Sequence, residues 1–153
     1  MILSRLDYCN SLFAEAPVCL IKRLQSVQNA AARVVSRTKK TDHITPILNM
    51  LHWLPVRERV VFKIGCLAHA CFYSAGPSYL NNIIPPHKPV RNLRSSTQPL
   101  LRPRIPCKKS FGSRAFTSVG PTLWNSLPED LRCCTSPTEF RKQLKTFLFK
   151  QTI

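Results

Sequence analysis

Apolar residues recur at helical spacing through most of the first half of the chain. The strongest pattern predicts a helix that begins at Pro17 and ends in the basic segment 37–40, with an inward stripe of Leu20, Leu24, Val27, Ala31 and either Val34 or Val35. A weaker pattern through Leu3 and Leu6 predicts a helix from residue 1 to about residue 13. Because this helix begins at Met1 without a capping residue, we expect it to be truncated at its N-terminus.

Two further helices are predicted before the middle of the chain. Asp42 or Thr45 is placed to cap a short helix that ends at Leu54, and Trp53 is expected to fill the core beside it. A long helix follows from residue 55 to about residue 73, with an inward stripe of Val60, Ile64, Leu67 and Cys71. Gly76 ends this helix, and residues 77–84 are expected to add a short helical segment.

The second half alternates proline-rich and helical segments. Six prolines in residues 85–110 prevent a regular helix, so we expect an extended and mobile connector there. Residues 111–116 are predicted to form either a short strand or an ordered turn, and residues 121–127 a short helix that carries Trp124. The last helix begins at a capping box, Ser136 to Glu139, and its buried face consists of Phe140, Leu144, Phe147 and Leu148.

These patterns predict a mostly α-helical protein with an irregular basic insertion. With 153 residues, 44% of them hydrophobic, the chain is long enough for one domain with a continuous core. We expect a helical part over residues 1–84, a proline-rich basic connector over residues 85–110, and a C-terminal helical part over residues 111–153 that packs on the first.

The charge of the chain is strongly unbalanced. There are 23 Lys and Arg residues against 7 Asp and Glu residues, which gives a net charge of +16, and residues 59–128 contain ten basic residues and no acidic one. Like charges oppose compaction unless an anionic partner is bound, so the composition favours nucleic acid as the partner. For the connector alone, the alternative is a solvated linker whose charges maintain solubility.

Phosphate contacts are expected from two basic segments, the second helix and the connector. We expect these side chains to bind the backbone of RNA or DNA without reading bases. The candidates are Lys22, Arg23, Arg33, Arg37, Lys39, Lys40, Arg94, Arg102, Arg104, Lys108 and Lys109. Tyr73, Tyr79 and Phe111 are candidates for stacking on unpaired bases, although core packing is the favoured role for each.

Catalytic and metal-binding patterns are poorly represented. The seven cysteines include no Cys-x-x-Cys pair, so we interpret them as small buried hydrophobic residues rather than zinc ligands. Seven acidic residues offer little choice for two-metal chemistry, and Glu129 and Asp130 are expected in the first turn of a helix. The four glycines lack the spacing of a phosphate-binding loop. We therefore expect a chain that is not an enzyme by itself and has no metal or cofactor.

No membrane-spanning or secretory segment is predicted. The longest apolar run, residues 60–72, is interrupted by Lys63 and His69 and falls short of the ~20 residues that a membrane span needs. The N-terminus reaches Arg5 and Asp7 too early for a secretory signal. We expect an intracellular protein with reduced cysteines, and the choice between nucleus and cytoplasm stays open.

Seven ordered sequence blocks carry a resemblance to one protein family. They are SRLDYCNSL at 4–12, LQSVQNAAAR at 24–33, DHITP through LHWLPVR at 42–57, GPSYL at 76–80, LRSS at 93–96, RAF at 114–116 and LWNSLP at 123–128. Together they resemble the C-terminal region of reverse transcriptases encoded by animal non-LTR retrotransposons, the LINE-like elements of the jockey and chicken-repeat type. The resemblance covers nearly the whole chain.

This resemblance implies a helical accessory region, downstream of the polymerase palm and thumb, that assists template or target handling during target-primed reverse transcription. It does not imply catalysis, because the Tyr-x-Asp-Asp signature of the palm is absent from this sequence. Two alternatives stay open. One is a docking module for the polymerase thumb or a cellular partner, and the other is a relic open reading frame whose product has no function.

Overall fold

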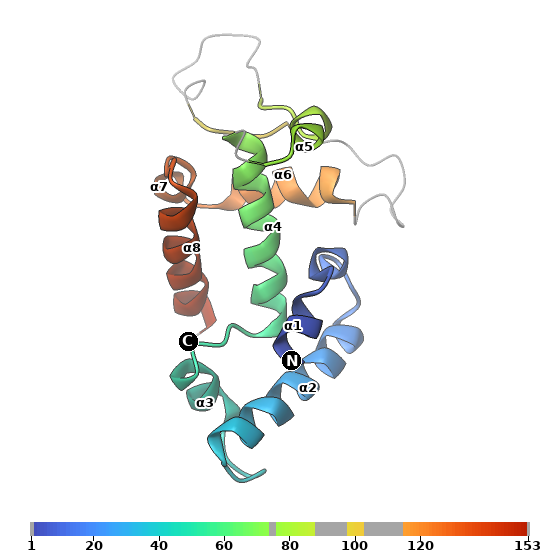
Figure 1. Ribbon diagram of the computed structural model, residues 1–153, viewed down its shortest axis with the longest axis vertical. Helices are drawn as coiled ribbons and strands as arrows, with labels where there is room; N and C mark the ends of the chain where they lie inside the picture. The colour runs from blue at the N-terminus through green and yellow to red at the C-terminus, as the bar shows by residue number, and fades with distance from the viewer. Residues whose placement is uncertain (1, 74–75, 88–97, 103–114, 153) are drawn as a thin grey trace.

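The computed structural model describes residues 2–73, 76–87, 98–102 and 115–152, and it is mostly α-helical as predicted (Figure 1). Its elements in chain order are α1 (Ile2–Asp7), the 3-10 helix η1 (Asn10–Phe13), α2 (Val18–Ser36), α3 (Ile44–Met50), α4 (Val56–Phe72), α5 (Ser78–Ile83), α6 (Phe116–Ser126), α7 (Glu129–Arg132) and α8 (Pro137–Thr152). Within the described residues, β structure is limited to an isolated antiparallel bridge between Pro86 and Leu101. Most of the strand or turn expected at 111–116 lies outside the described residues.

Helix α4 is the central element, with α8 along one side and α6 crossing behind it (Figure 1). The predicted long helix is confirmed, and its buried residues include Val56, Val60, Ile64, Ala68 and Cys71, whereas Leu67 is only half-buried. The approach of α8 requires a small residue on α4, because a Cβ atom at Gly65 would lie 2.9 Å from Cδ2 of Leu144. The two helices therefore pack in close contact at this level.

The main core lies between α4, α6 and α8 and is rich in aromatic rings. Trp124 and Phe140 are buried there, and the ring of His69 stacks on Phe140 with 4.3 Å between centroids. His69 Nε2 lies 2.8 Å from the carbonyl oxygen of Cys134, so Nε2 carries the proton and donates it to that oxygen. Burial lowers the pKa of His69, which favours the neutral ring in this apolar setting.

A second, smaller cluster joins α2 to α3 at the end of the molecule opposite α5 (Figure 1). Trp53 packs against its buried residues Ala32, Ile47 and Leu48, as the sequence predicts. Two glutamines of α2 connect this cluster to α4, with Gln28 Nε2 donating to the Leu54 carbonyl at 2.8 Å and the Val56 N–H donating to Gln25 Oε1 at 2.8 Å. Side chains of α2 thus satisfy backbone groups at the start of α4.

The direction in which α2 faces differs in part from the prediction, because Ala31 of the predicted inward stripe is buried but its leucines and valines are exposed or half-buried. The helix forms where expected, but Val27, Val34 and Val35 are 49%, 78% and 60% exposed, and Leu20 is exposed as well. The buried residues are Gln28, Ala31 and Ala32. Alanines allow close contact with α3, and the glutamines gain buried hydrogen bonds, so this face packs inward although it is less apolar.

The single helix predicted over residues 1–13 is wrong, because the chain breaks it after Asp7. Cys9 adopts a left-handed conformation with φ of 51°, which few non-glycine residues take, and η1 begins after it. Asn10 is buried as a result. Arg59 Nε donates to Asp7 Oδ1 at 2.8 Å, and this ion pair fastens the end of α1 to α4.

The starts of α3, α6 and α8 agree only in part with the predicted caps and prolines. Helix α3 begins at Ile44 without a side-chain cap, and Asp42 instead accepts a hydrogen bond from the Lys39 N–H at 3.1 Å. Helix α8 begins at Pro137 as predicted and buries Phe140, Leu144 and Leu148, but Glu139 accepts from Gln143 at 3.2 Å rather than closing a capping box. Helix α6 begins at Phe116 and contains Pro121 inside it, so it is longer than predicted.

The connector is anchored to α6 near its middle. Leu101 is completely buried, and the side chain of Asn125 bonds both of its backbone groups, accepting from the N–H at 3.0 Å and donating to the carbonyl at 2.9 Å. Trp124 Nε1 donates to the Pro99 carbonyl at 2.8 Å. The expectation of a mobile connector is therefore wrong for residues 98–102, while 88–97 and 103–110 lie outside the described residues.

Candidate nucleic-acid interface

Four of the predicted phosphate-contacting residues lie along one side of α2. Lys22, Arg23 and Arg37 are exposed, and Arg33 is half-buried. Lys22 and Arg33 are separated by eleven residues, so they share a face of a helix with 3.6 residues per turn, and Arg37 directly follows the last residue of α2. From Lys22 to Ser36 the helix extends about 21 Å. One strand of a duplex presents about six phosphates over that length.

The C-terminal half of this face forms a groove of about 600 Å³. We call it the basic groove, and its lining residues are Ser26, Asn29, Ala30, Arg33, Val34, Arg37, Thr38 and Lys40. Three of these residues are cations and none is an acid, and hydroxyl and amide groups complete the polar wall. Cations and neutral donors are the groups that proteins use to hold phosphate oxygens.

The sequence predicted the cations of the basic groove but not its neutral polar residues. Ser26, Asn29 and Thr38 line the groove and were not among the candidates. Ser26 lies four residues after Lys22 and seven before Arg33, and this helical spacing is the signal that identifies it. Thr38 follows the end of α2, where no periodicity applies.

The turn that follows α2 positions the end of the groove. The backbone of Arg37 adopts a left-handed conformation with φ of 54°. The N–H groups of Arg37 and Thr38 both donate to the Arg33 carbonyl. The hydroxyls of Ser36 and Thr38 lie 2.8 Å apart. Lys39 and Lys40 are both exposed on this turn, and Lys40 contributes to the basic groove.

Arg33 is the least solvated cation of this face. Its Nη2 donates to the backbone carbonyl of Asp42 at 3.3 Å, and its Nε is buried without a hydrogen-bond partner among the described residues. An unpaired buried donor costs about 1–3 kcal/mol, so a ligand oxygen that reaches Nε relieves that cost. Cations at this end of α2 also complement the negative end of the helix macrodipole, which is a structural role that needs no ligand.

Arg102, the connector candidate that the structure describes, is not brought to the basic groove. Arg102 is exposed, and its N–H donates to the Pro85 carbonyl at 3.3 Å. Residues 98–102 lie near α5 and α7, at the end of the molecule opposite the C-terminal end of α2 (Figure 1). Arg94, Arg104, Lys108 and Lys109 lie outside the described residues.

The candidate stacking residues have three different outcomes. Tyr73 packs in the core as favoured, with its hydroxyl donating to the Arg132 carbonyl at 2.7 Å and its ring 4.8 Å from that of His69. Tyr79 is 60% exposed, so core packing is wrong for this residue. Phe111 lies outside the described residues.

The cysteines are more exposed than predicted. Cys9, Cys19 and Cys133 are exposed free thiols, so their interpretation as buried hydrophobic residues is wrong. Cys71 is buried, and burial raises its pKa. Among the described residues, no group of three or more His, Cys, Asp or Glu side chains is placed to hold a metal ion.

An apolar groove of about 630 Å³ adjoins the basic groove along α2. It is lined by Ile2, Leu3, Val27, Ala30, Ala31, Val34, Val35 and Trp53, and it shares Ala30 and Val34 with the basic groove. The valines are those that the sequence pattern assigned to the core. The exposed side of α2 thus carries the apolar groove beside the basic groove.

Comparison of the chain with protein-family models, with curated proteins and with solved structures finds no match. Among the described residues, none of the helices combines the length and apolar character of a membrane span.

Proposed function

We propose that this chain is a non-catalytic, nucleic-acid-binding region and that the side of α2 from Lys22 to Lys40 holds a phosphate backbone. The observation that carries this proposal is the basic groove, where Arg33, Arg37 and Lys40 line one concave surface without an acidic residue. The net charge of +16 supports the same assignment. So does the resemblance of the sequence to the C-terminal region of LINE-like reverse transcriptases, where such a region would assist template or target handling.

The α2 side acts by itself in this proposal. The segment 98–102, which includes Arg102, lies at the end of the molecule opposite the C-terminal end of α2, so Arg102 is not counted in the phosphate path of α2 (Figure 1). The expected number of phosphate contacts is therefore about five, one for each of Lys22, Arg23, Arg33, Arg37 and Lys40. At about 0.7 log units per contact for single strands, the logarithm of the binding constant should fall with a slope of about −3.5 against log salt concentration.

Titration of single-stranded RNA and duplex DNA at increasing salt tests the proposal. The double variant Arg37→Glu, Lys40→Glu reverses two groove cations, and Lys142→Glu, Lys150→Glu reverses two exposed cations of α8 for the same change in net charge. We expect the groove variant to lower the slope by about 1.4 for single strands and the α8 variant to leave it nearly unchanged. An equal decrease of the slope in the two variants would show that affinity follows net charge alone and would overturn the proposed site.

Protein docking is the second candidate function, favoured by the apolar groove between α1 and α2. An apolar helix-in-groove interface responds little to salt, in contrast to phosphate binding. Absence of nucleic-acid binding at low salt by the folded protein would reject the first candidate and favour docking.

A further inference from the structure

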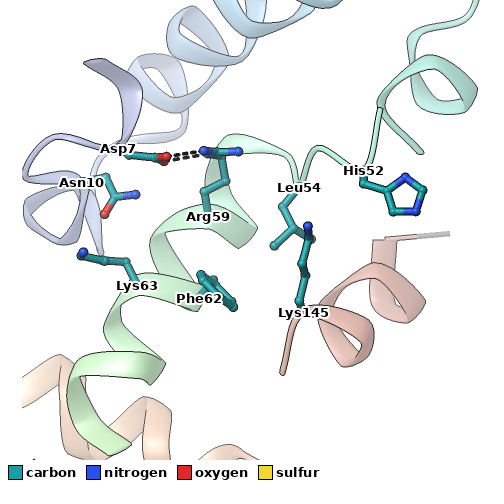
Figure 2. A pocket seen from close by; sticks show the side chains of 8 residues that line it. All are labelled: Asp7, Asn10, His52, Leu54, Arg59, Phe62, Lys63 and Lys145. Atoms are coloured by element: carbon teal, nitrogen blue, oxygen red, sulfur yellow. Dashed lines mark hydrogen bonds and ion pairs between the residues drawn. The ribbon is translucent and has the colours of Figure 1, made fainter. Parts of the chain in front are cut away.

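A separate cavity of about 320 Å³ lies where four distant segments of the chain meet (Figure 2). The segments are the α1–η1 turn, the α3–α4 loop, α4 and α8. The lining residues are Asp7, Asn10, His52, Leu54, Arg59, Phe62, Lys63 and Lys145. None of them lines the basic groove, so the two sites are distinct.

The charge of this cavity favours an anion. Arg59 is paired with Asp7, which is the only acid among the lining residues. Lys63 and Lys145 are the other two cations that line it, and no acidic lining residue is left to neutralise them. Lys145 Nζ lies 5.8 Å from the centroid of the Phe149 ring, and such a weak contact leaves its positive charge in place. A concave surface with this balance attracts a negatively charged group.

Asn10 gives a second, independent indication of a ligand. It is 4% exposed, and its Oδ1 has no hydrogen-bond partner among the described residues. Buried side-chain oxygens are normally bonded, so an unpaired one requires an explanation, and a donor group of a ligand supplies it. The left-handed backbone of Cys9 immediately precedes Asn10, and His52, with φ of 54°, also lines the cavity. Non-glycine residues in this conformation concentrate at functional sites.

The apolar part of the lining narrows the class of anion. Leu54 is buried and Phe62 is half-buried, and Figure 2 shows both side chains together with the three cations and Asn10. Inorganic phosphate would use only the cations, whereas a nucleotide also has a flat base that an apolar wall accommodates. A volume of about 320 Å³ is at the small end of ligand cavities, which suits a single nucleotide.

We infer that this cavity binds one nucleotide unit through its phosphate. Lys145 attracts the phosphate, and Leu54 and Phe62 contact the base or sugar. Asn10 Oδ1 accepts a hydrogen bond from a ribose hydroxyl or a base amine, and Lys63, which Figure 2 shows on the other side of Phe62 from Lys145, adds to the positive potential of the cavity. The same chemistry is offered by a free nucleotide and by the terminal nucleotide of a strand. The inference does not depend on phosphate binding by α2.

Calorimetry and NMR with AMP as the probe test this inference. We expect AMP to shift the side-chain amide resonances of Asn10 and to bind at least tenfold more tightly than adenosine, which lacks the phosphate. The variant Lys63→Ala, Lys145→Ala should weaken AMP at least tenfold, whereas Lys142→Ala, Lys150→Ala, which removes two exposed cations outside the cavity, should not. Circular dichroism of each variant confirms that it is folded.

Oligonucleotides with a 5′-phosphate or a 5′-hydroxyl distinguish the two sources of the nucleotide. Preference for AMP over both oligonucleotides assigns a free nucleotide. A shift of Asn10 with the 5′-phosphorylated but not with the 5′-hydroxyl oligonucleotide, in addition to the shift with AMP, assigns a strand end. Equal binding of AMP and adenosine, no shift of Asn10 with any probe, or full affinity in Lys63→Ala, Lys145→Ala would overturn the inference. Failure of phosphate binding by α2 can be distinguished from failure of nucleotide binding in the cavity. The variant Arg37→Glu, Lys40→Glu tests oligonucleotide binding by α2 and leaves the residues of the cavity unchanged.

Discussion

Replacing Asn125 with alanine tests whether α6 holds the connector. The carboxamide of Asn125 accepts from the Leu101 N–H at 3.0 Å and donates to the Leu101 carbonyl at 2.9 Å. These two partners fix its orientation, because the N–H must face the oxygen and the carbonyl must face the nitrogen. Alanine removes both bonds and leaves two backbone groups of a completely buried residue unpaired.

The protein can respond to Asn125→Ala in two ways, and the response with the lower free-energy cost sets the loss of stability. If residues 98–102 stay in place, two unpaired buried groups cost about 1–3 kcal/mol each. If the segment moves into water, Leu101 loses the burial of its side chain, which costs about 1.5–3 kcal/mol. Release also breaks the hydrogen bond from Trp124 Nε1 to the Pro99 carbonyl. Each response therefore costs at least about 1.5–2 kcal/mol, and we expect Asn125→Ala to lower the free energy of unfolding by at least about 1.5 kcal/mol.

Urea denaturation and hydrogen exchange measure the two parts of this prediction. The midpoint gives the loss of stability, and exchange of the Leu101 amide shows whether the segment is released. Ser126→Ala is the matched control, because Ser126 is exposed and, within the part of the chain that the structure describes, its hydroxyl bonds only to the Leu123 carbonyl of its own helix at 2.7 Å. A loss below about 0.5 kcal/mol together with a protected Leu101 amide would refute the reasoning.

Two further predictions concern titratable groups. Burial lowers the pKa of His69 below the value of 6.5 expected in the unfolded chain, so the stability due to its neutral form is complete above that pH and is lost as pH falls. His69→Gln keeps a donor for the Cys134 carbonyl but does not titrate. Between about pH 7 and pH 5 its urea midpoint should therefore fall less than that of the unmodified protein. An equal fall of the midpoint in the two proteins would contradict this prediction. Iodoacetamide alkylation followed by mass spectrometry should modify exposed Cys9, Cys19 and Cys133 before buried Cys71, and equal rates would contradict the burial of Cys71.

The sequence predicted which segments are helical better than which faces they bury. Apolar spacing and prolines located α2, α4 and α8, because both act within a few residues. The inward face of α2 depends instead on two hydrogen bonds, in which Gln28 donates to the Leu54 carbonyl and Gln25 accepts from the Val56 N–H. A hydropathy pattern counts these glutamines as exposed, so it placed the valines inward and was right only for Ala31.

One candidate site could be predicted from the sequence, and the other could not. The basic residues of α2 lie close together in sequence, and charge alone identified them. The cavity for which we infer nucleotide binding combines Asn10, Leu54, Lys63 and Lys145, whose association depends on the packing of α4 against η1 and α8. Spacing along the chain carries no information about such contacts. The clamp of Asn125 on Leu101 is equally long-range, although the predicted short helix already carried Trp124 beside it.

The orientation of α2 determines how its two candidate functions are related. Arg33 follows the buried Gln28 by five residues, which is about 140° around the helix axis, and Val27 and Val34 lie about 100–120° from Gln28 in the opposite direction. Rotating the helix to bury the valines would therefore bring Arg33 and Arg37 closer to the core, where unpaired charges are costly. Burial of the glutamine and alanine face keeps the cations in water and leaves the valines beside them. A phosphate backbone needs to contact only the basic groove. A protein that covers this side of α2 must instead bury the apolar groove and pair the cations of the basic groove. The slope of binding against salt counts the cations that are engaged and is insensitive to the valines, so it separates the two partners on one helix.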